Sequence, residues 1–326
     1  KTSLLEALAY LGRGKSFRGA GTSDLIRHGK DEFVLFGQVR MESRTRSLGA
    51  KNSRSGLEVR VDGDSEGGAA ALAEAMPLQV IDPEVHSLVA GGPELRRRFL
   101  DWIGFHVEHE HLLAWRRFRR AQKQRNAALK AKAAAATIRS WNAEFVELGL
   151  QLDDSRRRAL EVTMDGLTSF GEKLLMTELH FDYQQGWGRD KDLAQALDDG
   201  LQRDLLMGAT QQGPHRADLK ISYDERQARK LVSRGQQKLL ASAMILAATE
   251  TAQAALERPL LLLLDDPAAE LDEDSLSRLM GAVAGLGCQV IATSLAPDAI
   301  AAPADAALFH VEQGVLAPAQ GPEDPR

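Results

Sequence analysis

The chain has 326 residues, of which 44% are hydrophobic and 27% charged, and its formal net charge is −5. This composition is that of an ordinary soluble globular protein, and the length allows two domains or one domain with a large insertion. The single cysteine, Cys288, excludes an internal disulfide and a cysteine-based zinc cluster, and it fits a reducing compartment. No apolar run reaches the roughly 18 residues of a membrane span and no signal peptide is recognisable, so we expect a cytoplasmic protein.

The first two residues, Lys1-Thr2, stand directly before a stretch with helical apolar spacing. This order resembles the end of the phosphate-binding loop G-x-x-x-x-G-K-[ST], in which the lysine contacts phosphates and the hydroxyl binds Mg²⁺. A Lys-Thr pair is more often a solvated surface pair. The phosphate-loop interpretation is supported here only by a strand predicted far downstream, at residues 260–264. In this interpretation the N-terminal strand and the glycines of the loop are absent from the given chain.

Short strands are predicted in the first third of the chain. Residues 32–41 and 56–61 have the apolar and alternating patterns of strands. The polar and basic stretch between them, residues 43–55, is expected to be the mobile end of a hairpin. Residues 78–82 form a further short strand that ends before Pro83.

From Pro93 the pattern changes to that of long helices. Apolar side chains recur at three- and four-residue steps from Leu95 to Leu113, and the helical pattern continues to Lys132 without a breaker. These residues predict one helix of about 60 Å. A second helical region is predicted for residues 137–175, so the two helices would form an antiparallel hairpin that projects as an arm.

The first of these helices carries a run of basic residues. Between Leu112 and Lys132 there are eight basic residues and no acidic one. Charge runs usually form a solvated helix face, but here the basic residues have no acidic partner four residues further on. An unpaired cationic stripe is typical of contact with the phosphate backbone of DNA. The candidate DNA contacts are Arg116, Arg117, Arg119, Arg120, Lys123 and Arg125.

Residues 106–111 contain three histidines and two glutamates, which are metal-binding residue types. On a helix, however, only His106 would share a face with His109 or Glu110. No cysteine or further carboxylate completes a metal site. We therefore expect a structural role for this segment.

Residues 177–223 are predicted to contain a strand at 177–185, a helix at 192–207 and a strand at 220–223. Before the last strand stands the loop Gly213-Pro214-His215-Arg216-Ala217-Asp218-Leu219. Such dense polar chemistry suits a functional loop, but a plain turn is the alternative, and both stay open.

An apolar run at residues 260–264 consists of five leucines and precedes Asp265 and Asp266. Such a run is typical of a central parallel strand that is covered on both faces. The two carboxylates would lie at the carboxyl edge of the sheet, where open α/β sheets bind ligands. Asp265 can then hold Mg²⁺, and Asp266 can orient or deprotonate an attacking water. The plain alternative is that both merely end a strand.

A helix is predicted to begin near Arg234, with Ser233 as its N-cap. Gly235 would let a ligand approach the backbone closely, and the N–H groups at this positive helix end can bind phosphate. Further downstream we expect a helix at 274–286, a strand at 289–293 and a strand at 306–311 that closes the sheet.

Several of these motifs resemble those of known ATPases. Asp265-Asp266-Pro267-Ala268-Ala269-Glu270-Leu271-Asp272 resembles the Walker B and D-loop run of ABC-type ATPases, and Val232-Ser233-Arg234-Gly235-Gln236 resembles their signature motif. Over essentially its whole length the chain resembles the bacterial RecF family. The residues that carry this resemblance are Lys1-Thr2-Ser3-Leu4-Leu5-Glu6-Ala7, Ser16-Phe17-Arg18, Leu25-Ile26-Arg27-His28-Gly29, Gly91-Gly92-Pro93-x-x-Arg96-Arg97-x-Phe99-Leu100-Asp101, Lys123-Gln124-Arg125-Asn126-Ala127-Ala128-Leu129, Gly213-Pro214-His215-Arg216-Ala217-Asp218 and Ser233-Arg234-Gly235-Gln236.

The resemblance implies an α/β fold with an ABC-type ATPase head, whose mixed sheet has a parallel P-loop core, and with an inserted helical-hairpin arm. Residues 1–88 and 205–326 would form the head, and residues 89–204 the arm. It further implies ATP-dependent dimerisation on DNA, slow ATP hydrolysis and partnership with RecR. Together with RecO, such a protein would help to place RecA on gapped DNA.

The resemblance also implies roles for single residues. Lys1 and Thr2 would belong to Walker A, where they bind ATP and Mg²⁺, and Asp265 would be the Walker B ligand of Mg²⁺. Asp265 and Asp266 would both be catalytic, and Asp266 stands where many ABC ATPases have a glutamate. The nucleotide of a second subunit would be contacted by the signature residues Ser233, Arg234, Gly235 and Gln236. Asp272 would be a nucleotide-binding residue of the D-loop. Thr293-Ser294 stands where transporters usually place a histidine, and this departure fits slow hydrolysis.

Three other classes of protein are alternatives. An ATPase subunit of a membrane transporter is disfavoured by the basic arm and by the missing histidine. An SMC-like head of a chromosome-organising protein would need coiled coils of hundreds of residues. A DNA-binding protein with a vestigial nucleotide site is the third.

Overall fold

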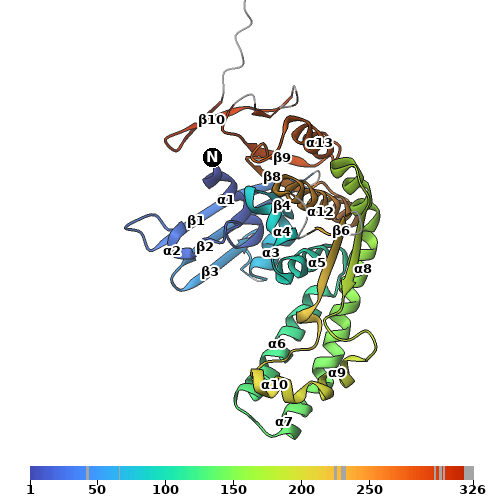
Figure 1. Cartoon of the computed structure of the whole chain (residues 1–326). Helices are drawn as coiled ribbons and strands as arrows, with labels where there is room; N and C mark the ends of the chain where they lie inside the picture. Colours follow the sequence, from blue (N-terminus) through green and yellow to red (C-terminus); the bar gives the residue numbers. More distant parts are fainter. Residues whose placement is uncertain are drawn as a thin grey trace, which may run out of the picture. The chain divides into compact units, whose positions relative to one another are not determined.

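The computed structural model describes residues 1–41, 44–65, 67–223, 226–228, 233–296, 299–300, 303 and 305–318. Packing divides the chain into two units, which Figure 1 shows in the colours of the sequence. The first unit comprises Lys1–Pro83, Leu261–Gly281 and Cys288–Arg326, and the second comprises Glu84–Leu260 and Ala282–Gly287. The predicted limits of the arm, residues 89 and 204, fall within the second unit and stay a prediction.

A three-stranded parallel sheet forms the centre of the first unit. Strand β8 (Leu261–Asp265) lies between β4 (Leu78–Ile81) and β9 (Gln289–Thr293). All residues of β8 are buried, because a central strand is covered on both faces. The leucine run therefore forms the central parallel strand that its composition predicts.

A three-stranded antiparallel sheet, in the order β1-β2-β3, completes this core. Strands β1 (Glu32–Arg40) and β3 (Gly56–Val61) lie where the sequence predicts them. The expected mobile hairpin end between them is wrong, because β2 (Thr45–Ser53) is the middle strand of the sheet. Its alternate residues Leu48 and Ala50 are buried, and the polar residues between them hide this alternation. Residues 42–43 lie outside the described part of the chain.

Helix α1 (Thr2–Arg13) packs against the parallel sheet and against the β1-β2-β3 sheet. Its residues Leu5, Ala9 and Leu11 join the core formed with β2, β3, β4 and β8. Two short helices, α2 (Thr22–Leu25) and α3 (Ala69–Ala75), belong to the same unit. This packing fixes the N-terminus of α1 against the parallel sheet.

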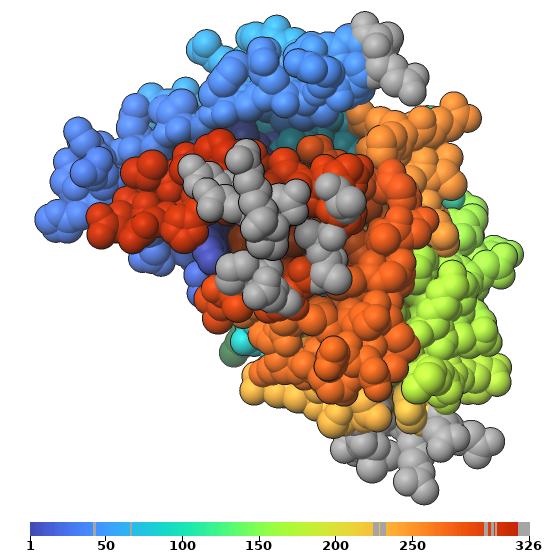
Figure 2. All heavy atoms as spheres, turned by 90° about the horizontal axis from the view of Figure 1, so that it is seen from above, coloured from blue at the N-terminus to red at the C-terminus, as the bar shows by residue number. Residues whose placement is uncertain are grey.

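The C-terminal stretch does not close the parallel sheet as predicted. Strands β10 (Phe309–Glu312) and β11 (Val315–Pro318) form a separate antiparallel hairpin. Nearly every residue of this hairpin is exposed, and Figure 2 shows it in red at the surface. Its register places Phe309, Val311, Leu316 and Pro318 on one face, and Phe309 and Leu316 are exposed there.

Long helices dominate the second unit. Helices α6 (His111–Lys130) and α8 (Asn142–Leu175) pack side by side as an antiparallel pair, joined through α7 (Ala135–Ser140). Phe118 and Phe145 lie at the centre of the core between them, with ring centroids 5.0 Å apart. The predicted helical hairpin is present.

The single helix predicted from residue 93 to residue 132 is wrong. Helix α5 (Pro93–Val107) ends at Glu108, whose backbone is extended, and α6 begins only at His111. His111 packs so closely on Gly104 that a β-carbon there would lie 2.5 Å from His111 Nδ1. His111 Nδ1 also shares a hydrogen bond of 2.8 Å with Ser155 Oγ. These tertiary contacts end the helix without any breaker in the sequence, and they give His111 the structural role that we expect.

The remaining elements of the second unit include a helix that differs from its prediction. The predicted helix 192–207 is divided at Gly200, and the other predicted elements are present with shifted ends. Predicted and unpredicted elements together, this part of the chain contains η1 (Pro83–His86), which begins at the last residue of the first unit, and α4 (Ser87–Ala90), β5 (Leu179–Gln184), α9 (Leu193–Asp199), α10 (Leu201–Met207), η2 (Pro214–Arg216), β6 (Asp218–Tyr223), β7 (Arg226–Gln227) and α12 (Arg234–Leu256). Strands β5, β6 and β7 pair in this order. Helix α13 (Glu273–Ala284) follows β8.

Helix α12 corrects the expectation that no apolar stretch is long enough to span a membrane. Among the described residues it is the one helix whose length and mean hydropathy of 1.4 would suffice. However, 67% of this apolar window is buried inside the protein. Helices α5 and α8 pack against it, as neighbours pack against a core helix.

Candidate nucleotide site and basic groove

The N-terminus of α1 meets the carboxyl end of β8 in the first unit. Thr2 Oγ1 donates a hydrogen bond of 3.1 Å to Asp265 Oδ1. Lys1 Nζ donates a hydrogen bond of 2.6 Å to the carbonyl oxygen of Ser294, just beyond β9. The structure thus brings together the two residues that we predicted as Mg²⁺ ligands, although they come from opposite ends of the sequence.

Asp265 and Asp266 differ in their surroundings. Asp265 is 7% exposed, whereas Asp266 is half-buried and has a left-handed backbone with φ of 49°. The backbone N–H of Asp266 donates to the carbonyl oxygen (3.2 Å) and to the hydroxyl oxygen (3.3 Å) of Thr293. The adjacent β9 therefore holds the backbone that follows Asp265.

The donor set at this site fits Mg²⁺. A hydroxyl and a carboxylate oxygen lie in contact, and Mg²⁺ is a hard cation that takes oxygen ligands. Within the described ranges, no group of three or more His, Cys, Asp or Glu residues could hold a metal ion. Mg²⁺ sites in nucleotide-binding proteins use one or two carboxylates plus phosphates, so Thr2 and Asp265 are a sufficient protein contribution.

Thr293 is a site residue whose contact with Asp265 was not predicted. Its Oγ1 donates a hydrogen bond of 2.8 Å to Asp265 Oδ1, the same oxygen that accepts from Thr2. Asp265 and Thr293 are paired in the parallel register of β8 and β9. The available signal was the position of Thr293 at the end of a predicted parallel strand, because the carboxyl ends of such strands share one edge.

Asp272 directly precedes α13 and accepts a hydrogen bond from the first turn of that helix. Its Oδ1 accepts a hydrogen bond of 2.7 Å from the backbone N–H of Ser275, and this bond lowers the pKa of the Asp272 carboxyl. The side chain is exposed. A contact of Asp272 with a nucleotide stays a prediction.

The signature residues form the N-terminus of α12 in the second unit. Ser233 Oγ accepts from the backbone N–H of Gln236 (3.3 Å), and Gln236 Oε1 accepts from the backbone N–H of Ser233 (3.0 Å). Ser233 is thus the N-cap that the sequence predicts, in a capping box. Ser233, Arg234 and Gln236 are exposed and Gly235 is half-buried, while Val232 lies outside the described residues. An exposed helix N-terminus of this kind can bind phosphate.

An open groove of about 610 Å³ runs along α6 and is called the basic groove below. Its lining contains four cationic side chains and no acidic one. The lining residues are Arg119, Arg120, Gln122, Lys123, Asn126, Ala127 and Lys130. The Arg119 guanidinium lies over the Trp115 ring, 4.8 Å from its centroid. Arg116 and Arg117 are exposed on the same helix.

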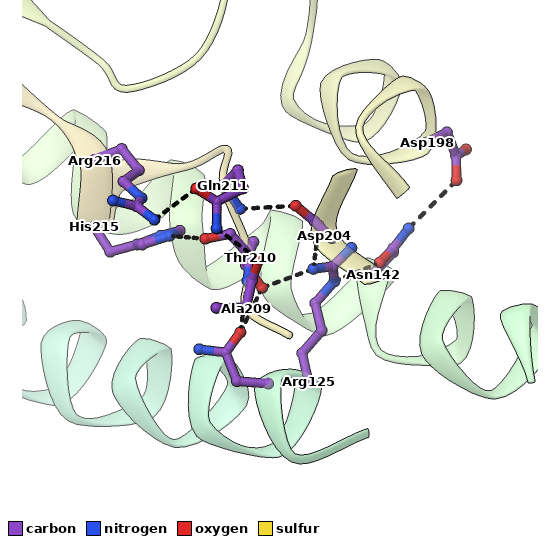
Figure 3. A network of polar contacts seen from close by, with 10 residues as sticks. Arg125, Asn142, Asp198, Asp204, Ala209, Thr210, Gln211, His215 and Arg216 are labelled. Carbon is purple, nitrogen blue, oxygen red and sulfur yellow. Dashed lines mark hydrogen bonds and ion pairs between the residues drawn. The ribbon is translucent and has the colours of Figure 1, made fainter. Parts of the chain in front are cut away.

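Arg125 is wrongly predicted as a DNA contact. Its side chain has no exposed surface, because it points into the second unit, as Figure 3 shows. Nη1 donates to Asp204 Oδ2 (2.7 Å) and to Thr210 Oγ1 (2.7 Å), and Nε donates to Asn142 Oδ1 (3.0 Å). The buried ion pair with Asp204 neutralises the charge of Arg125. Arg125 therefore stabilises the packing of the arm and does not contact a ligand.

Two of the family motifs meet in this same network. Thr210 donates through its backbone N–H and its hydroxyl to Asn126 Oδ1, each at 2.8 Å. Its carbonyl oxygen accepts a hydrogen bond of 2.8 Å from His215 Nε2. Burial lowers the pKa of His215 to about 4, so the ring is neutral at pH 7. The Lys-Gln-Arg-Asn-Ala segment and the Gly-Pro-His-Arg loop are therefore joined through one threonine.

The rest of the 213–219 loop also binds helices of the second unit. Arg156 Nη1 donates to the carbonyl oxygen of Pro214 (2.7 Å), and Arg96 Nε forms a buried ion pair with Asp218 Oδ1 (2.7 Å). Gly213 has φ of 128°, and a β-carbon there would lie 3.0 Å from the Phe145 ring. Of the two open interpretations, these contacts favour a structural loop that ties α5 and α8 together.

Comparison with known proteins gives concordant results. A family model described as RecF/RecN/SMC N terminal domain matches residues 1–316. The DNA replication and repair protein RecF of Photorhabdus laumondii subsp. laumondii is 38% identical over 322 residues, which cover 97% of this chain and 89% of that protein. RecF of Edwardsiella ictaluri is 39% identical over 322 residues, with coverages of 97% and 90%.

Solved structures show the same fold at lower identity. A structure of the recombination mediator protein RecF with ATP, in the RecFOR pathway, matches with a TM-score of 0.87 and 23% identity over 98% of this chain and 88% of that chain. An Smc head bound to the C-winged helix domain of ScpA matches with a TM-score of 0.52 and 14% identity, covering 97% and 84%. These likenesses confirm the predicted fold class, the mixed α/β fold of RecF and SMC heads. The family model and the sequence identities together show that the chain belongs to the RecF family.

Proposed function

We propose that this chain is an ATP-dependent DNA-binding protein of recombinational repair that hydrolyses ATP slowly. The observation that carries this proposal is the 3.1 Å hydrogen bond between Thr2 and Asp265. It joins the end of the predicted phosphate loop to the end of the Walker B strand. The relatives bear the name DNA replication and repair protein, and one solved relative holds ATP, which supports the same role. A cytoplasmic location follows from it.

Each residue of the nucleotide site has a distinct task. Lys1 would contact the β- and γ-phosphates, and Thr2 with Asp265 would hold Mg²⁺. Bound Mg²⁺ would neutralise charge on the phosphates and orient them. Asp266 would accept a proton from the water that attacks the γ-phosphate, so that ADP and phosphate are formed.

We propose slow hydrolysis because this site differs from the usual pattern of ABC ATPases at two positions. Asp266 has a shorter side chain than the glutamate of many ABC ATPases, so its carboxylate reaches less far towards a water. Thr293 and Ser294 stand where transporters place a histidine, and Thr293 is hydrogen-bonded to Asp265 instead. Bound ATP would then act chiefly by holding two subunits together.

We propose that ATP binding drives the formation of a homodimer. Ser233, Arg234, Gly235 and Gln236, with Asp272, would bind the nucleotide held by a second copy. The exposed, capped N-terminus of α12 supports this role, because its backbone N–H groups suit a γ-phosphate. RecR would be a direct partner, and RecO and RecA would be functional partners. A solved relative is described as a recombination mediator protein in the RecFOR pathway, which supports a role among such partners.

The basic groove, with Arg116 and Arg117, is proposed as a DNA-binding surface for gaps or junctions between single and double strands. The residues retained from the predicted set are Arg116 and Arg117 on the same helix, and Arg119, Arg120 and Lys123 in the lining of the groove, where Lys130 joins them. These side chains are exposed. A cationic groove without acidic residues attracts the DNA backbone by releasing its counterions.

Calorimetric titration of ATP with Mg²⁺ tests the nucleotide site. The wild-type protein should bind ATP, and Asp265→Asn should weaken this binding by at least about 10-fold, because a Mg²⁺ ligand is weakened. Asp274→Asn changes an exposed carboxylate in the first turn of α13 and should bind like the wild type. Equal affinity of the Asp265→Asn protein and the wild type would show that Thr2 and Asp265 do not form the site.

A further inference from the structure

Thr293 contacts both carboxylate residues at the end of the parallel sheet. Its hydroxyl donates to Asp265 Oδ1 at 2.8 Å, and its hydroxyl and carbonyl oxygens both accept from the backbone N–H of Asp266. We propose that Thr293 is a positioning residue that orients Asp265 and Asp266 for the Mg²⁺-bound nucleotide. This inference rests on the proposed function of the site.

The first part of this role concerns the two oxygens of Asp265. Thr2 and Thr293 both donate to Oδ1, while no hydrogen bond reaches Oδ2 from the part of the chain that the structure describes. Two donors on one oxygen fix the rotation of the carboxylate and leave Oδ2 available to a cation or to its bound water. Partners of this kind orient metal ligands and raise their affinity.

The two hydroxyls are not equivalent. Thr2 begins α1 and would itself touch the cation, whereas Thr293 belongs to β9 and touches only the protein. Loss of the Thr293 hydroxyl should therefore weaken Mg²⁺ binding without removing a ligand. Loss of the Thr2 hydroxyl removes a ligand as well as a donor.

The second part concerns the backbone of Asp266. A non-glycine residue with φ of 49° is uncommon and needs support from its surroundings. The bonds from its N–H to Thr293 give that support, and they set where the Asp266 side chain leaves the strand. One residue of β9 thus fixes both the cation-binding carboxylate and the carboxylate that would receive the proton.

The side chain of Thr293 can be tested with near-isosteric changes. Thr293→Val removes the hydroxyl and keeps the shape, while Thr293→Ser keeps the hydroxyl. Thr251→Val is a matched control, because that hydroxyl donates only within α12, to the carbonyl oxygen of Ala247. Thermal unfolding without ligand should first show that all three proteins are folded.

The measurement is a Mg²⁺ titration of the binding of a fluorescent ATP analogue, compared with binding of the analogue in EDTA. Thr293→Val should need about 10- to 100-fold more Mg²⁺ for half-maximal binding, with unchanged affinity in EDTA. Thr293→Ser and Thr251→Val should match the wild type.

The possible failures are distinct. If the wild type bound no nucleotide, the proposed function itself would be wrong, and with it this role. If the wild type bound nucleotide with Mg²⁺ but Thr293→Val had the same Mg²⁺ requirement, only the role of Thr293 would be wrong. The same holds if Thr293→Ser behaved like Thr293→Val, because the hydroxyl would then not be the group responsible.

Discussion

At the scale of single residues, burial and ion pairing set the protonation states within the second unit. Burial would raise the pKa of Asp101, but the charge of Arg156 and the hydrogen bonds from its guanidinium outweigh it and hold the pKa at about 2. For His215, burial is the dominant cause, and it lowers the pKa to about 4. The two groups therefore lose stabilisation in different pH ranges.

His215 should make stability fall as the pH falls from about 6.5 to about 4. The unfolded chain binds a proton on this ring below its ordinary pKa of 6.5, but the folded protein does not until about 4, so acid favours unfolding. The loss should be on the order of 3 kcal/mol and should not grow below pH 4.

Urea unfolding at pH 7.5 and pH 4.5 measures this loss in the wild type and in a His215→Gln protein, which keeps an N–H donor for Thr210. The free energy of unfolding should fall less in the variant than in the wild type. His180→Gln serves as the control, because that ring is exposed in the folded protein. An identical pH dependence of the His215→Gln protein and the wild type would contradict the predicted role of burial.

Arg125 shows what residue types alone could not reveal. By composition it belongs to the basic run, yet the spacing of Phe118, Ala121 and Leu129 places position 125 on the buried face of α6. The helical period was therefore a usable signal for its burial. Its partner Asp204 was not predictable, because that contact depends on how α10 packs against α6.

At the scale of elements, the basic residues of α6 lie on two opposite faces of the helix. The groove cations face outward, where they meet no acidic side chain in the lining, whereas Arg125 is enclosed on the opposite side. Substitution of a groove residue should therefore change binding to DNA and leave the fold intact. Substitution of Arg125 would leave the carboxylate of Asp204 buried without its cation, which destabilises the protein.

The salt dependence of DNA binding distinguishes the groove from the rest of the surface. Arg119→Gln and Lys123→Gln should each weaken binding for all sequences, and each should reduce the slope of log affinity against log salt by about 1. Arg139→Gln is the control, since Arg139 is exposed on α7 but paired with Asp198. If Arg139→Gln changed the slope as much as the groove variants, the groove would not be the DNA-binding surface.

Element boundaries were predictable where local chemistry decides them. Ser233 caps α12, and the leucine run forms β8, because a few adjacent residues determine the capping of a helix and the burial of a strand. The end of α5 at Glu108 and the middle position of β2 depend instead on contacts with distant segments, such as that of His111 with Ser155. Such tertiary contacts leave no local pattern.

At the scale of the whole molecule, the first unit joins segments from both ends of the sequence. Helix α1 and strand β8 are distant in sequence, yet they meet because parallel strands and the helix packed on them share one core. The motifs made this meeting predictable, since a Walker A end and a Walker B strand are expected at the same edge of the sheet. The contribution of β9 through Thr293 required the register of the two strands.

In the proposed mechanism, ATP held at Lys1, Thr2 and Asp265 drives two copies of the chain together. Light scattering after size exclusion gives the molar mass of the protein with ATP and Mg²⁺, with ADP and Mg²⁺, and without nucleotide. We expect a doubled mass with ATP and Mg²⁺ only, and its return to the monomer when EDTA is added. A protein that binds ATP and Mg²⁺ but keeps the mass of a monomer would contradict this mechanism.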